Sequence, residues 1–71
     1  MPRTRRRVAR ALCHPLRATL SKRINAAARP LPLEDLARAL DLAVGHARYH
    51  VRVLAACGLA KIDDDDCTQP A

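Results

Sequence analysis

Basic and polar residues spaced for one face of a helix carry the possible chemistry of this chain. Arg48 and Arg52 are one helical turn apart, and His46 and Tyr49 lie near them in the sequence. An arginine presents paired N–H donors that match the two acceptors of a guanine edge or the oxygens of a phosphate. Gly45 has no side chain and would let the helix backbone approach a ligand closely. These residue types at this spacing favour a helix that binds a nucleic acid.

Two predicted helices with a tight turn between them must position these residues. The first is predicted over residues 33–40, where apolar side chains recur at the i, i+3, i+4 and i+7 positions of one helix face. Asp41 is expected in the turn because aspartate tolerates the left-handed conformation better than most residues do. The second helix is predicted over residues 44–57 and ends at Gly58. Its buried stripe is expected to consist of Ala47, Val51 and Leu54. Two short helices joined in this way, the second with a basic face, are typical of a helix-turn-helix.

The same region is similar to a known family. Residues 33–62 resemble the DNA-reading part of ArsR-like winged helix-turn-helix repressors, most closely over the stretch ARYHVRVLAACGL. Residues 14–24, HPLRATLSKRI, resemble the helix that precedes the motif in that family. The resemblance implies a DNA-binding transcriptional regulator whose second motif helix lies in the major groove, and a homodimer is the expected form. It also implies that Arg48 faces DNA, where an arginine would favour guanine.

The candidate DNA-binding residues on this interpretation are Arg5, Arg6, Arg7, Gly45, His46, Arg48, Tyr49 and Arg52. His46, Arg48 and Tyr49 are expected to face the bases from the first half of the helix. Arg52 is better placed for a phosphate. His50 is expected to pack at the helix edge and to hydrogen-bond locally. The alternative is that all of these are ordinary exposed polar side chains.

Charge is distributed unevenly along the 71 residues, whose formal net charge is +6. Nine of the 13 Lys and Arg residues precede residue 30, and all seven acidic residues follow residue 33. Residues 1–7, MPRTRRR, are predicted to form a basic N-terminal arm. A basic excess of this kind favours polyanions such as DNA. A chain of this length is one small domain, and such domains often gain stability by pairing with a second copy.

The expected fold is mainly α: a winged-helix-like helix-turn-helix domain of about four helices over residues 8–62, with at most a short or incomplete β-wing. Pro15 is expected to begin a helix that extends to about Ala27. The four adjacent aspartates Asp63–Asp66 have poor strand propensity and repel one another. Residues 63–71 are therefore predicted to be an acidic disordered tail.

Other chemistries have little support in the sequence. His46 and His50 are four residues apart, as some zinc ligands are, but no Cys or carboxylate lies nearby and no metal is predicted. There is no Gly-rich phosphate loop and no nucleophile beside a base, so neither an enzyme nor a cofactor is expected. The three cysteines form no CxxC pair, and no apolar run is long enough for a signal peptide or a membrane span. These features predict a cytoplasmic protein without a membrane partner.

The sequence leaves two main classes of function open. The first is a transcriptional regulator that binds double-stranded DNA, with no identifiable small-molecule effector. The alternative is a helix-turn-helix protein-interaction module that pairs with another regulator without sequence-specific DNA binding. A truncated coding sequence with no independent role is a third possibility, because the expected wing is short.

Overall fold

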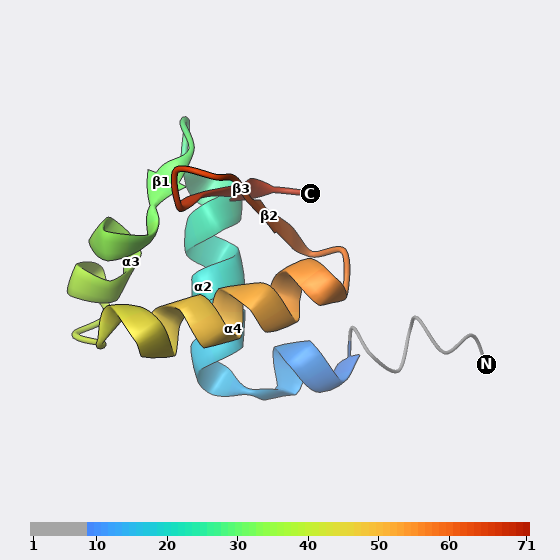
Figure 1. The fold of residues 1–71 in the computed structure, drawn as a ribbon. Helices are drawn as coiled ribbons and strands as arrows, with labels where there is room; N and C mark the ends of the chain where they lie inside the picture. Colours follow the sequence, from blue (N-terminus) through green and yellow to red (C-terminus); the bar gives the residue numbers. More distant parts are fainter. Residues whose placement is uncertain (1–8) are drawn as a thin grey trace.

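A computed structural model describes residues 9–71 of the chain (Figure 1). A helical segment at residues 9–13 precedes α2, which spans Pro15–Ala26. The two motif helices are α3, Leu33–Ala39, and α4, Val44–Ala56. The strands are β1, Leu31–Pro32, β2, Ala60–Ile62, and β3, Cys67–Pro70. The described part of the chain is mainly helical with a small antiparallel sheet, which confirms the predicted fold class.

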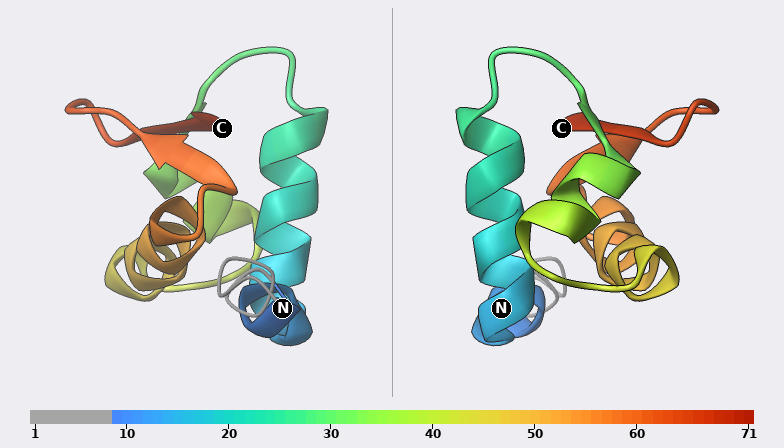
Figure 2. Two further views of the ribbon diagram at one scale, coloured as in Figure 1. Left: turned by 90° about the vertical axis from the view of Figure 1, so that its right-hand side faces the viewer. Right: turned by 90° about the vertical axis from the view of Figure 1, so that its left-hand side faces the viewer.

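Helix α2 occupies one side of the molecule, and α3, α4 and the sheet gather on the other side (Figure 2). It begins at Pro15, whose missing N–H is tolerated in the first turn of a helix. Thr19 Oγ1 donates a hydrogen bond of 3.0 Å to the Pro15 carbonyl. The helix ends at Ala26 because Ala27 is extended, with φ −74° and ψ 137°. The predicted end was one residue later.

The turn between α3 and α4 is closed by the backbone. Asp41 has a φ of 54°, the left-handed conformation that the sequence predicted for it. The Leu42 N–H donates a hydrogen bond of 2.8 Å to the Ala37 carbonyl. The Leu42 side chain packs against the core, and α4 begins two residues later at Val44. The predicted helix-turn-helix is therefore present, with one left-handed residue in its turn.

Helix α4 ends in a Schellman motif centred on Gly58. The φ of Gly58 is 74°, a conformation that glycine adopts without the strain of a Cβ. The Leu59 N–H donates to the Leu54 carbonyl at 2.9 Å, and the Gly58 N–H donates to the Ala55 carbonyl at 3.0 Å. Both bonds satisfy carbonyls that the helix end would otherwise leave unpaired. The chain then enters β2 without a further loop.

The prediction of a disordered tail over residues 63–71 is wrong. Strand β3 lies in the middle of the sheet, between β1 and β2, and pairs with both in antiparallel fashion. Thr68 is buried in β3, and its Oγ1 donates a hydrogen bond of 3.0 Å to the Leu31 carbonyl. The aspartates form the turn of the hairpin rather than a strand, which suits the turn preference of aspartate. The wing is short but complete.

The core is built almost entirely from aliphatic side chains. Its buried members are Ala11, Leu20, Ile24, Leu33, Leu36, Ala37, Ala47, Val51, Leu54 and Ala60. The predicted stripe of α4 is confirmed, because its three members are all in this set. Leu40, the last residue of the apolar face predicted over residues 33–40, is only partly buried. With α4 anchored in this way, its opposite side is left facing solvent.

Candidate nucleic-acid interface

The outward side of α4 carries most of the residues that the sequence singled out. Gly45, Tyr49 and Arg52 are exposed, and Arg48 is half-buried. Because these four residues are spaced three or four apart, they form one continuous surface, here named the α4 face. Tyr49 is the most apolar part of it and is 60% exposed. The fold therefore presents an arginine–tyrosine–arginine surface at the second motif helix.

Gly45 lies in the first turn of α4 and is exposed there. A Cβ added at this position would meet no atom within 4 Å. Packing within the described residues therefore does not require a glycine here. That openness is compatible with the predicted role of Gly45 in close approach to a ligand.

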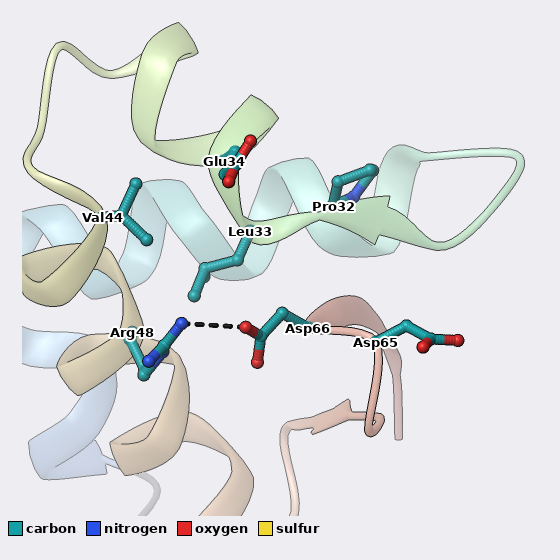
Figure 3. A pocket seen from close by; sticks show the side chains of 7 residues that line it. All are labelled: Pro32, Leu33, Glu34, Val44, Arg48, Asp65 and Asp66. Carbon is teal, nitrogen blue, oxygen red and sulfur yellow. Dashed lines mark hydrogen bonds and ion pairs between the residues drawn. The ribbon is translucent and has the colours of Figure 1, made fainter.

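Arg48 is held by a residue from the wing. Its Nη2 donates a hydrogen bond to Asp66 Oδ2 at 2.8 Å, and the two charges form an ion pair (Figure 3). The side chains of the pair are 39% and 54% exposed, so water screens their interaction. The Nε of Arg48 is buried and has no hydrogen-bond partner in the described structure. Only its terminal nitrogens remain available to a ligand.

The Arg48–Asp66 pair borders a pocket of about 260 Å³ between the starts of α3 and α4 and the wing turn (Figure 3). The pocket is lined by Pro32, Leu33, Glu34, Val44, Arg48, Asp65 and Asp66. Three carboxylates and one guanidinium give it a negative balance. The sequence did not predict Asp66 as a site residue. The sequence signal that could have indicated Asp66 was the preference of aspartate for turns, because a turn at Asp63–Asp66 brings the wing back to α4.

His46 is exposed, but one of its ring nitrogens is turned toward its own helix. His46 Nε2 lies 3.1 Å from His50 Nε2, so one ring donates a proton and the other accepts it. A base contact through His46 Nε2 would have to replace this hydrogen bond. The prediction that His50 hydrogen-bonds locally is confirmed, although His50 lies in the interior rather than at an edge, at 4% exposed.

A cluster of three imidazoles joins α4 to the start of α2. The His14 ring centroid lies 4.7 Å from that of His50, and the His46 centroid lies 4.9 Å from it. Tyr49 meets His50 edge-on at 5.1 Å. We name His14, His46 and His50 the histidine cluster. Burial lowers the pKa of His50, and the neighbouring His14, His46 and Arg17 lower it further. Both effects favour the neutral form of His50.

The remaining polar groups give little support to other chemistries. Within residues 9–71 no group of three or more His, Cys, Asp or Glu side chains could hold a metal ion. Burial and the nearby Asp63 and Asp65 raise the pKa of the Cys67 thiol, which disfavours the reactive thiolate. No helix in the same range is long and apolar enough to cross a membrane.

The predicted site residues thus fall into three groups. Gly45, Arg48, Tyr49 and Arg52 share the α4 face. His46 lies on the same helix but takes part in the histidine cluster. Arg5, Arg6 and Arg7 lie outside the described residues. Comparison with protein families, curated proteins and solved structures finds no match to this chain. Its function must therefore be inferred from its own geometry and charge.

Proposed function

We propose that this chain is a transcriptional regulator that binds double-stranded DNA by placing α4 in the major groove. The single observation that carries the proposal is the α4 face. It is the outward surface of the second helix of a helix-turn-helix, and it presents Arg48, Tyr49 and Arg52 to solvent. A second motif helix of this kind fits the major groove and reads bases from its first half. The resemblance of residues 33–62 to ArsR-like repressors supports the same function.

Charge and size support the rest of the proposal. The formal net charge of +6 favours association with a polyanion, and residues 1–7 would add phosphate contacts through Arg5, Arg6 and Arg7. The core is small and aliphatic, so pairing of two copies would add stability. A dimer would also place two copies of α4 on successive turns of the duplex. We propose a dimeric repressor that acts in the cytoplasm.

Arg48 and Arg52 have distinct expected roles in this complex. Arg48 lies in the second turn of α4, where it can reach a base edge, and Arg52 lies one turn further along. Removal of a base-reading arginine should cost roughly 1–3 kcal/mol on the preferred site and relax the preference at one base pair. Removal of a phosphate-binding arginine should weaken all sequences about equally.

The experiment is fluorescence anisotropy at fixed salt on a duplex selected from random DNA and on a scrambled duplex. Arg48→Ala should reduce the discrimination between the two duplexes by roughly 1–3 kcal/mol, whereas Arg52→Ala should preserve it and weaken both complexes. Arg23 is exposed on α2, so Arg23→Ala removes one positive charge from a different helix and serves as the matched control. Equal binding of both duplexes by the wild type would refute sequence-specific recognition.

One observation favours a second function. The aspartates Asp63–Asp66 form the turn of the wing beside α4, and carboxylates there repel phosphates. A helix-turn-helix with an acidic wing suits a protein partner better than DNA. This interaction-module alternative predicts weak binding to both duplexes and no difference among the three arginine variants.

A further inference from the structure

We propose that Asp66 is an internal competitor for Arg48. Its carboxylate engages the guanidinium that would otherwise bind a guanine edge or a phosphate, and it thereby sets the affinity of the α4 face for DNA. The proposal rests on the DNA-binding function proposed above and names a residue that tunes it. Three features of the structure lead to it: the fixed position of Asp66, the restricted donors of Arg48, and the exposure of the pair.

The wing turn fixes Asp66 independently of Arg48. Its backbone carbonyl accepts a hydrogen bond of 2.8 Å from the Leu33 N–H, and its own N–H donates to the Asp63 carbonyl at 3.1 Å. The Asp63 carboxylate accepts two further hydrogen bonds of 2.9 Å, from the N–H groups of Asp65 and Cys67. Asp66 adopts a left-handed φ of 59° in this turn. The turn therefore holds the backbone of Asp66 in place independently of its ion pair with Arg48.

Arg48 has few ways to bind DNA while it keeps its ion pair with Asp66. Its Nε is buried, so a ligand must use the terminal nitrogens, and Nη2 already donates to Asp66 at 2.8 Å. Recognition of guanine by arginine uses two donors in one plane. Phosphate binding depends on the positive charge, which a paired carboxylate offsets locally. In either mode the DNA competes with Asp66 for the same guanidinium.

The pair is also easily exchanged. Both side chains are more than one-third exposed, and exposed ion pairs contribute little to folding. Figure 3 shows Arg48 and Asp66 pointing toward each other, whereas the Asp65 carboxylate points away from Arg48. Asp65 thus carries the same charge on the same turn without the contact. It provides a control that separates competition for Arg48 from general repulsion of DNA.

The test compares Asp66→Asn with Asp65→Asn in the full chain, with and without Arg48→Ala. Asparagine tolerates the left-handed conformation, so Asp66→Asn should keep the turn. Affinity for the selected duplex is measured by fluorescence anisotropy at fixed salt. Asp66→Asn should tighten binding about 1.4- to 5-fold more than Asp65→Asn, the range that corresponds to one exposed ion pair. In the Arg48→Ala background this extra gain should disappear.

Three outcomes would overturn the proposal: an equal effect of the two substitutions, weaker binding by Asp66→Asn, or an extra gain that persists without Arg48. If the wild type binds no duplex, the proposed function fails, and inorganic phosphate then serves as the probe. NMR of the Arg48 side-chain N–H groups should show phosphate binding more strongly in Asp66→Asn than in Asp65→Asn. Equal phosphate binding in the two variants would reject the competitor role by itself.

Discussion

The Arg48–Asp66 pair and the histidine cluster both involve α4, yet they differ in burial. Both side chains of the ion pair are more than one-third exposed, and they join α4 to the wing turn. His50, at the centre of the cluster, is 4% exposed and joins α4 to the start of α2. The difference teaches that burial, rather than residue type, decides which polar groups of this helix a ligand can reach.

Burial also decides how the ion pair and the histidine cluster contribute to the free energy of unfolding. Water screens the exposed pair, so the pair can break and form again at small cost in free energy. His50, at the centre of the histidine cluster, is shielded from water, so a proton placed on His50 is opposed by desolvation and by its charged neighbours. We expect the strength of the ion pair to depend on ligands and salt, and the contribution of the histidine cluster to stability to depend on pH.

The largest expected effect comes from a substitution in the core that anchors α4, on which both the ion pair and the histidine cluster depend. Leu54 is fully buried on α4 and belongs to the core that anchors this helix. Leu54→Ala should lower the free energy of unfolding by about 2–5 kcal/mol, the usual range for loss of a buried leucine side chain. Urea denaturation followed by circular dichroism measures it.

Leu12→Ala is the matched control, because Leu12 is 39% exposed. It removes the same atoms from a helical segment, and its effect should be well below that of Leu54→Ala. A loss under about 0.5 kcal/mol for Leu54→Ala would show that α4 is not anchored through this residue.

The next largest expected effect is a pH dependence of the free energy of unfolding that arises from the histidine cluster. The pKa of His50 is lowered from 6.5 by burial first, and then by His14, His46 and Arg17. The unfolded chain therefore binds more protons than the folded chain once the pH falls below about 6.5. The stabilisation from neutral His50 is fully present above that pH and is lost as the pH falls toward the folded-state pKa. The slope cannot exceed about 1.4 kcal/mol per pH unit for one proton.

Urea denaturation at intervals between pH 8 and pH 5.5 measures this dependence above the range in which carboxylates titrate. His50→Gln keeps a polar group near His46 without a titrating ring, and its unfolding free energy should vary less over the same range. Tyr49 also faces His50 but is not charged at these pH values. If wild type and His50→Gln give parallel curves, His50 is not the group that titrates.

The helix-turn-helix could be predicted closely because its signals are local. The stripe of Ala47, Val51 and Leu54 fixes the buried side of α4 by helical spacing alone. Asp41 and Gly58 mark the turn and the helix end because few residues adopt their positive φ values without strain. Once the buried side is known, exposure of Arg52 and Tyr49 follows from the same spacing.

The wing and its contact could not be predicted in the same way. Strand β3 is stabilised by pairing with β1, more than 30 residues away, and by the hydrogen bond from Thr68 to Leu31. Strand propensity within residues 63–71 does not contain that information. Asp66 reaches Arg48 only after the hairpin has formed, so the ion pair depends on a long-range contact. The hydrogen bond between His46 and His50 could have been predicted from local spacing, because the two residues are four apart on one helix.

The smallest expected effect is the contribution of the Arg48–Asp66 pair to folding. Arg48→Ala also removes aliphatic packing, so a double-mutant cycle with Asp66→Asn is needed to isolate the coupling between the two charges. Because the side chains are 39% and 54% exposed, the coupling should be about 0.2–1 kcal/mol and should shrink as salt is added. Urea denaturation of the four proteins at low and high salt measures it. A coupling above about 2 kcal/mol would exceed the range for exposed pairs and would mark the contact as structural. DNA could not then displace Asp66 at small cost, and the contrast between an exchangeable ion pair and the buried His50 would not hold.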